Sequence, residues 1–339
     1  MTSREIIQKA IHFQTPPRLP VLMACFGVDD TAGVGPKAPA GWQPAREGLD
    51  EWGCVWHKTD MVNMGQVKER PLEDIGGLAR SRPPDYTDAS RYADMGAAFD
   101  KAEAAGKYAI CGVFMILFER MHTLHGFENT LVDLYENRSA MEDLADMIVE
   151  THLTLVREVH RRFPGRLNAW GMSDDWGTQQ AAFVSFDLWM DFFHPRYKRL
   201  YDAMHADGGD IWVHSCGKVN EIIEGYIRAG ANVVNLQQPR ALGIEEIGRR
   251  YRGRITFQSL ADIQTSLPSG DRQAVRDDVT QLMRHWATPQ GGFIFSDYGG
   301  DEAIGVKDPG IKRFMYDEFS RASQALYGAP LPPPVTGGK

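Results

Sequence analysis

The chain has 339 residues, of which 43% are hydrophobic and 24% are charged, and 45 acidic against 37 basic side chains give a net charge of −8. This composition is typical of a soluble globular protein and excludes a disordered chain, a collagen and a disulfide scaffold. With no visible basic patch we expect no nucleic-acid partner, and with no apolar run of about 18 residues we expect no membrane span.

The predicted elements begin with a short amphipathic helix, because Thr2 and Glu5 have the spacing of a capping box before Ile6 and Ile7. Runs of β-branched and aromatic residues, each followed by polar or glycine residues, predict strands at 19–23, 108–113, 167–171, 210–214, 232–236, 254–258 and 292–295, with a weaker one at 53–56. Apolar residues at helical spacing predict helices at 141–163, 187–206, 219–229, 244–251, 272–286 and 309–327.

From residue 167 onward strands and helices alternate, which indicates a parallel sheet covered by helices. About eight strands, without a Gly-x-Gly-x-x-Gly after the first, favour a (β/α)8 TIM barrel of the α/β class over an open dinucleotide-binding sheet. We expect residues 1–327 to form this single domain, with long loops at 28–46 and 63–85, and residues 328–339 to be a disordered tail. Four cysteines and no signal peptide at residues 1–13 predict reduced thiols in a cytoplasm.

In such a barrel the working residues follow the C-terminal ends of the strands. Short polar side chains follow five consecutive predicted strands: Asp174 and Asp175, then Cys216 and Lys218, then Gln237 and Gln238, then Asp262, and last Asp297, Tyr298 and Asp301. Any one of them could instead cap a helix. Five such groups at successive strand ends predict a site on this face.

The most specific pattern is His214-x-Cys216. Residues i and i+2 of a strand point to the same side, so the imidazole and the thiol should both face the barrel mouth. Both are preferred zinc ligands, and a catalytic zinc takes three ligands from the protein. The alternative is a buried histidine beside a small apolar cysteine.

Asp174 and Asp175 could act as a base, as a substrate-orienting acid or as a metal ligand. Neighbouring residues of a strand alternate, so we expect one carboxylate to face the mouth and the other to cap the following turn. Trp176 and Tyr298 are most simply core or rim aromatics, or they form a stacking wall beside the acids.

Short motifs occur in a specific order along the chain: Glu51-Trp52-Gly53, Phe118-Glu119-Arg120, Gly126-Phe127-Glu128-Asn129, Gly171-Met172-Ser173-Asp174-Asp175-Trp176-Gly177, Pro195-Arg196-Tyr197-Lys198, His214-Ser215-Cys216-Gly217 and Val306-Lys307-Asp308-Pro309-Gly310-Ile311. By these motifs the chain resembles the uroporphyrinogen decarboxylase superfamily, and within it the branch of corrinoid-dependent methyltransferases. The resemblance runs from about residue 4 to residue 321 and implies a (β/α)8 barrel, which agrees with the strand count.

The resemblance also implies zinc, held by His214, Cys216 and a ligand after the last strand. That ligand is a cysteine in the methyltransferase branch, whereas this chain has none there. Asp301 or Asp297 would then supply an oxygen ligand, and Cys25 is a more remote choice.

The implied reaction moves a methyl group between a small methylated substrate, or a thiol, and a corrinoid cofactor. The chain lacks the Asp-x-His-x-x-Gly signature of a corrinoid-binding domain, so a partner protein would bring the corrinoid. The sequence leaves open whether the chain forms a homodimer. In this interpretation one of the two aspartates protonates or orients the substrate, which Trp176, Gln237, Gln238 and Tyr298 contact.

Two alternatives stay open: a metal-free decarboxylase or other lyase, with Asp174 or Asp175 moving the proton, and a non-catalytic tetrapyrrole- or corrinoid-binding protein. The missing third cysteine supports the second. Decarboxylases of the superfamily carry an arginine-rich segment after the first strand, but residues 23–30 contain no arginine. About seven acids against Lys218 at the strand ends would repel a polyanion and suit a neutral or cationic methylated substrate.

Overall fold

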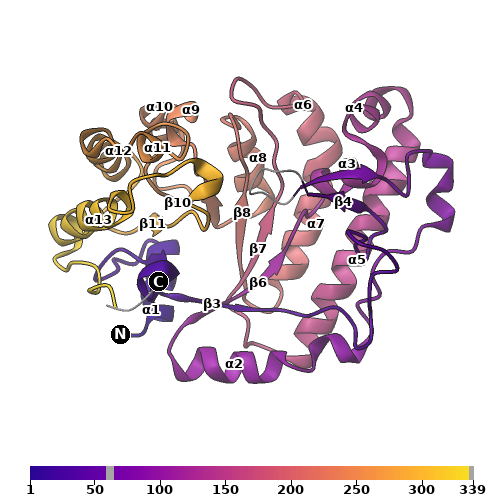
Figure 1. Ribbon diagram of the computed structural model, residues 1–339. Helices are drawn as coiled ribbons and strands as arrows, with labels where there is room; N and C mark the ends of the chain where they lie inside the picture. Colours follow the sequence, from indigo (N-terminus) through magenta and orange to yellow (C-terminus); the bar gives the residue numbers. More distant parts are fainter. Residues whose placement is uncertain (59–64, 336–339) are drawn as a thin grey trace.

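The computed structural model describes residues 1–58 and 65–335. Its main sheet has nine strands in the order β2-β1-β11-β10-β9-β8-β7-β6-β3. The bounds are β1 (Val21–Met23), β2 (Val28–Asp29), β3 (Thr31–Val34), β6 (Tyr108–Val113), β7 (Ala169–Ser173), β8 (Asp210–His214), β9 (Val233–Asn235), β10 (Thr256–Ser259) and β11 (Phe293–Ser296). Neighbouring strands are parallel except for β1 with β2. The fold is therefore the predicted (β/α)8 barrel (Figure 1).

One short segment joins the two ends of the sheet. β2 pairs antiparallel with β1, and β3 pairs parallel with β6. Between β2 and β3, the backbone N–H of Asp30 donates to the Val21 carbonyl at 2.9 Å, and its carbonyl accepts from Tyr108 N at 3.0 Å. The buried Asp30 carboxylate accepts from Val21 N at 2.9 Å and pairs with Arg18 at 2.7 Å. The chain thus changes its pairing partner at Asp30 and connects β1 to β6.

These contacts show that the strands and loops predicted for the N-terminal half were partly wrong. The second barrel strand is β3, inside the stretch 28–46 that was expected to be a loop, and only residues 35–46 lack helix and strand. The predicted strand at 53–56 contributes instead to β4 (Val55–His57), which pairs with β5 (Gln66–Glu69) in a separate two-stranded sheet. The expected loop at 63–85 contains β5 and a 3-10 helix at Ile75–Arg80, and residues 59–64 lie outside the described range.

Helices cover the outside of the barrel (Figure 1). They are α1 (Ser3–Ile11), α2 (Met95–Ala104), α3 (Phe118–His125), α4 (Phe127–Glu136), α5 (Arg138–Arg162), α6 (Phe186–Leu188), α7 (His194–His205), α8 (Ile222–Ala229), α9 (Pro239–Leu242), α10 (Ile244–Tyr251), α11 (Ser266–Ser269), α12 (Arg272–His285) and α13 (Ile311–Tyr327). A π-helical segment, Trp189–Phe193, divides the helix predicted at 187–206. No helix in the described ranges is long and apolar enough to cross a membrane.

The first part of the expected tail packs on the barrel. Leu331 is buried, and Val335 N donates to the carbonyl of Phe26 at 2.9 Å. These contacts hold residues up to 335 in place, in contrast to the predicted disorder. Residues 336–339 lie outside the described range.

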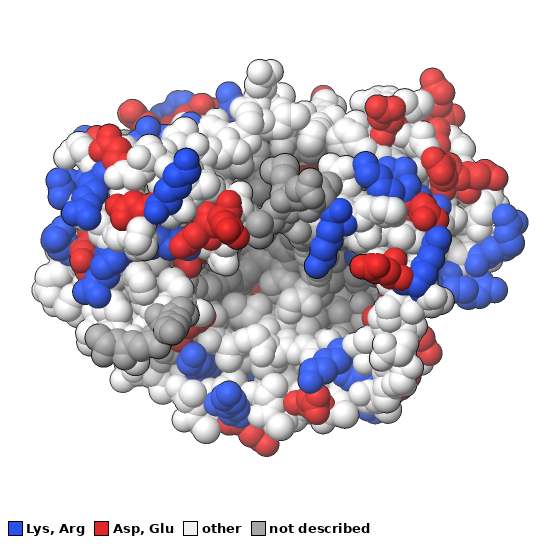
Figure 2. All heavy atoms as spheres, in the orientation of Figure 1, with Lys and Arg blue, Asp and Glu red and all other residues white. Residues whose placement is uncertain are grey.

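The bottom of the barrel is filled and its upper interior is open. Helix α1 has the predicted capping box, and its Ile7 and Ile11 pack against interior side chains of the strands. Above this floor, Gly112 of β6 lies opposite Gly171 of β7. A Cβ atom placed at Gly112 or at Gly33 of β3 would meet no heavy atom within 4 Å. The interior therefore stays hollow on this side, and Figure 2 shows a hollow at the centre of the visible face.

Candidate functional site

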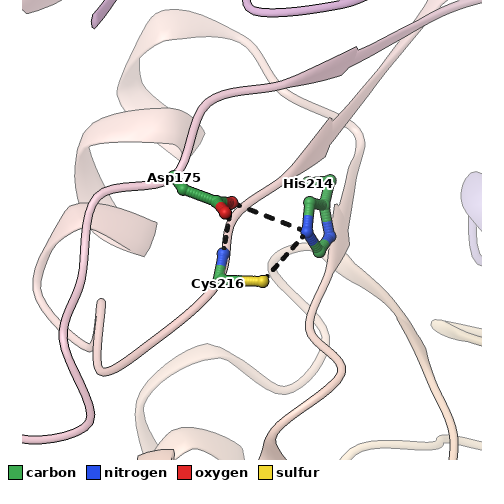
Figure 3. A group of neighbouring side chains, drawn as sticks. All are labelled: Asp175, His214 and Cys216. Atoms are coloured by element: carbon green, nitrogen blue, oxygen red, sulfur yellow. Dashed lines mark hydrogen bonds and ion pairs between the residues drawn. The ribbon is translucent and has the colours of Figure 1, made fainter. Parts of the chain in front are cut away.

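The register of three strands places polar side chains on the interior face above the glycines. Ser173 of β7 lies opposite His214 of β8, and His214 lies opposite Asn235 of β9. The side chain of Asn235 is 3.3 Å from His214 Nδ1. This contact fixes one ring nitrogen and leaves Nε2 directed toward the loops that follow β7 and β8 (Figure 3).

At these loops Asp175, His214 and Cys216 form a compact group (Figure 3). The Cys216 thiol is 3.3 Å from His214 Nε2, and Asp175 Oδ1 is 3.6 Å from the same nitrogen. One ligand atom from each of the three residues lies within 4.8 Å of the others. Asp175 Oδ1 also accepts from Cys216 N at 2.8 Å, which ties the β7 loop to the β8 loop. The group contains a nitrogen, a sulfur and an oxygen donor.

The electrostatic surroundings keep the Cys216 thiol protonated. Burial raises the pKa of Cys216 well above its usual range, and the Asp175 carboxylate raises it further. A thiolate at this position therefore needs a cation beside it. A metal ion held by the same three residues would supply that charge, because a coordinating thiol is deprotonated.

Asp174 lies on the other side of the backbone and is fully buried. Its carboxylate accepts from Phe118 N at 2.8 Å and Glu119 N at 2.6 Å, and it also accepts from the Tyr197 hydroxyl. It therefore caps the N-terminus of α3 from a distant part of the chain. The two neighbouring aspartates have different surroundings, and Asp174 positions α3 rather than facing the mouth.

Glu119 belongs to the motif Phe118-Glu119-Arg120 and is a site residue that was not among those predicted. It is 8% exposed, and its carboxylate accepts from the Ser173 hydroxyl at 3.1 Å and from the backbone N–H of Asp175. Burial raises the pKa of Glu119 above its usual range, and the carboxylates of Asp174 and Asp175 raise it further. Its place in the motif Phe118-Glu119-Arg120 was the signal available for it.

The other predicted substrate contacts differ in exposure. Trp176 has no exposed surface, stacks on Phe118 at a ring distance of 4.2 Å and so belongs to the core. Gln238 is 7% exposed, and its amide oxygen accepts from Gly217 N at 3.1 Å, so it supports the loop that carries Cys216. Gln237 and Tyr298 are half-buried at their strand ends and remain available to a ligand.

Asp301 is not part of the three-residue group. Its carboxylate pairs with the buried amine of Lys312, which also contacts Asp297 at 2.8 Å. Cys25 donates its thiol hydrogen to Asp297 at 3.3 Å, and burial raises the pKa of this thiol to about 12. The third ligand candidate is therefore Asp175, rather than the residues expected after the last strand.

A cleft of about 940 Å³ opens beside the ends of β1 and β11. Apolar side chains, including Leu22 and Phe26, line part of it, and Asp29, Asp297 and Asp301 line another part. Lys312 is the cation in this lining, and Asp297 and Asp301 neutralise it. The cleft therefore has apolar surface beside an excess of negative charge.

A family model for uroporphyrinogen decarboxylase (URO-D) matches residues 67–297. Among solved structures, a methyltransferase from Methanosarcina mazei superposes with a TM-score of 0.63 at 11% sequence identity, over 94% of this chain and 99% of that one. Xylanase 10B from Thermotoga maritima has a TM-score of 0.38 at 11% identity, over 95% of this chain and 100% of that one. No protein of curated function matches significantly. At this identity the likeness to the methyltransferase establishes the barrel fold, and the family match covers most of the chain.

Proposed function

The chain belongs to the uroporphyrinogen decarboxylase (URO-D) family, and on this premise we propose that it is a zinc-dependent methyltransferase. The observation that carries the proposal is the convergence of Asp175, His214 and Cys216 at the barrel mouth. The structural likeness to the Methanosarcina mazei methyltransferase agrees with this choice within the family.

The donor set suits zinc in chemistry, and two of its three donor–donor distances suit zinc in geometry. Zinc bound tetrahedrally at about 2.0–2.3 Å keeps its nitrogen, oxygen and sulfur ligands about 3.3–3.7 Å from one another. The sulfur–nitrogen and nitrogen–oxygen distances of 3.3 and 3.6 Å lie in this range before any rearrangement. Three protein ligands also leave one position open, as catalytic zinc sites do.

Zinc held there would polarise the oxygen, nitrogen or sulfur atom that carries the methyl group, or would hold a thiol acceptor as its thiolate. Asn235 orients the imidazole of His214, and the Asp175 carboxylate, through Cys216 N, keeps the two loops at a fixed distance. Gln238 supports the same loop through Gly217. These contacts hold the ligands in place before a substrate arrives, which fixes the geometry of the site.

The substrate we propose is a small neutral or cationic methylated compound. The hollow beside Gly33 and Gly112 gives room next to the ligand group. Asp29, Asp297 and Asp301 give the neighbouring cleft a negative charge that disfavours anionic substrates. Gln237 and Tyr298, both half-buried, are the predicted side chains that remain able to contact such a substrate.

We further propose that a corrinoid on a separate protein gives or takes the methyl group at the barrel mouth. The sequence contains no Asp-x-His-x-x-Gly signature of its own for that cofactor. Such a partner would have to approach the barrel mouth, because the ligand group lies at the strand ends.

Metal content tests the zinc site directly. Protein purified without chelator should contain about one zinc per chain, which Cys216→Ala should lose and Cys25→Ala should keep. Zinc-loaded protein should then convert free cob(I)alamin to methylcobalamin with a methylated amine, ether or thioether, followed by absorbance. If the wild-type chain binds no zinc even after reconstitution, the zinc mechanism is wrong.

A metal-free lyase is the second candidate, and one observation favours it. Glu119 is a buried carboxyl group with a raised pKa beside Asp175, which suits proton transfer to a carbanion. A lyase of this kind would release carbon dioxide from a small carboxylated substrate and keep its full rate after treatment with a chelator. The methyltransferase would lose its activity under the same treatment.

A further inference from the structure

A second pocket, of about 200 Å³, lies outside the three-residue group, between the ends of β3 and β6 and helix α5. Trp52, Tyr86, Arg91, Arg120 and His152 line it, together with Glu51. None of Asp175, His214 and Cys216 lines this pocket. Its lining also includes Gly112, which borders the hollow of the barrel.

Arg120 is a buried cation of this pocket with unused hydrogen-bond donors. Its side chain is 6% exposed, and in residues 1–58 and 65–335 its Nε and Nη1 atoms have no hydrogen-bond partner. The guanidinium lies over the Trp52 ring at 4.8 Å. A buried charged group without hydrogen bonds costs free energy, and native structures rarely contain one without a partner of some kind.

The nearby carboxylates are already used by other donors. Asp50 is 3.5 Å from Arg120 Nη1, without hydrogen-bond geometry, while its oxygens accept from Trp56 Nε1 at 2.9 Å and from Cys54 N at 2.8 Å. Glu51 is paired with Arg91. Arg120 is thus the cation of the pocket lining that still has hydrogen-bond donors without an acceptor.

Two further groups in the lining can donate hydrogen bonds. His152 is 1% exposed, and neither of its ring nitrogens has a hydrogen-bond partner among the described residues. Tyr86 is half-buried, and its phenol is close enough to Arg120 and Arg91 to feel both charges. A guanidinium, an imidazole and a phenol around one small cavity form a donor set for an oxyanion.

We infer that this pocket binds the carboxylate group of a small organic acid, with Arg120 as its main donor. The planar guanidinium matches a carboxylate better than a point charge does. A carboxylate is preferred to a phosphate because Glu51 and Asp50 lie nearby, so a dianion would meet more repulsion than a monoanion. The cavity volume limits the ligand to a few heavy atoms besides the carboxylate.

Calorimetric titration with acetate and propionate, against chloride at equal ionic strength, tests this inference. The wild-type chain should show saturable binding, Arg120→Gln should weaken it by about tenfold to a hundredfold, and phosphate should bind more weakly than acetate. Arg162→Gln is the matched control, because Arg162 lies over the Tyr92 ring at 4.6 Å but is paired with Glu158 at 2.9 Å.

Tyr86→Phe gives a second variant that removes one donor without removing a buried charge. It should weaken acetate binding several-fold while the chain stays folded. Saturable binding that is equal in the wild-type, Arg120→Gln and Tyr86→Phe proteins would overturn the inference. No saturable binding of acetate or propionate to the wild-type protein would overturn it as well. Zinc content does not enter this test, so its outcome is independent of the proposed methyl transfer.

Discussion

Asp174→Ala should lower the stability of the chain and leave metal binding intact, whereas Asp175→Ala should abolish metal binding and leave stability nearly unchanged. Asp174→Ala removes the acceptor of three buried donors: Phe118 N, Glu119 N and the Tyr197 hydroxyl. Asp175→Ala removes the acceptor of one, Cys216 N, from a side chain that is 38% exposed. The two changes are neighbours in sequence, yet only the first disturbs the packed interior.

The structure sets the size of each effect. Each buried donor left without a partner costs about 1–3 kcal/mol, so three of them cost about 3–9 kcal/mol. Asp174→Ala should therefore destabilise the chain by at least about 3 kcal/mol, which lowers Tm by at least about 4 °C in a protein of this size. Asp175→Ala should cost no more than about 1 kcal/mol.

Thermal unfolding of chelator-treated protein measures the first effect without a contribution from bound metal. Zinc content after reconstitution measures the second: Asp174→Ala should keep zinc, and Asp175→Ala should lose it. The reasoning fails if Asp174→Ala unfolds at the wild-type temperature, or if Asp175→Ala keeps wild-type zinc affinity. Either result would mean that the two carboxylates do not divide the structural and ligand roles between them.

Three further predictions follow from single contacts. The pKa of His12 is raised by its hydrogen bond to Asp210. The protonated histidine should therefore stabilise the fold by less than about 1 kcal/mol, fully below about pH 6.5 and progressively less as pH rises through the raised pKa. His12→Gln should remove this pH dependence of the urea midpoint. Gly112→Val should fill the hollow without loss of stability, since a Cβ atom there meets no heavy atom within 4 Å. It should raise KM for bulky substrates about tenfold more than KM for small ones. Equal KM changes would argue against a substrate in the hollow. Gly225→Ala should cost about 3 kcal/mol in chemical denaturation, because a Cβ at this position would overlap the Trp189 ring, whereas an unchanged midpoint would show that the ring can move aside.

The C-terminal part of the barrel could be predicted from the sequence because each strand there is an apolar run followed by a helix. β3 could not, because Thr31-Ala32-Gly33-Val34 lies in a stretch rich in glycine, proline and alanine, which is typical of a loop. It becomes a strand through its pairing with β6, a contact with residues that follow it by more than seventy positions. Local pattern therefore assigned the eighth strand to 53–56, which pairs elsewhere.

The candidate site could be predicted in part, for a similar reason. The i, i+2 spacing places His214 and Cys216 together, and the structure has this arrangement. Which of Asp174 and Asp175 joins them is decided by the N–H groups of α3, which accommodate Asp174. No spacing within the β7 loop contains that information. Trp176 was open to both interpretations in sequence, and its stacking on Phe118 assigns it to the core.

The pairing of β1 with β11 has a consequence for how the chain is made. Val21 of β1 is in register with Phe295 of β11. During synthesis β1 is therefore made first and must wait for β11, which is made near the end. At about 5–20 residues per second, this wait lasts roughly a quarter of a minute to a minute. During that time one edge of β1 has no partner and is open to pairing with another chain. Closure joins the beginning and the end of the chain in one late event, so substitutions at the β1–β11 seam should lower the yield of folded protein during synthesis more than they lower the stability of the finished barrel.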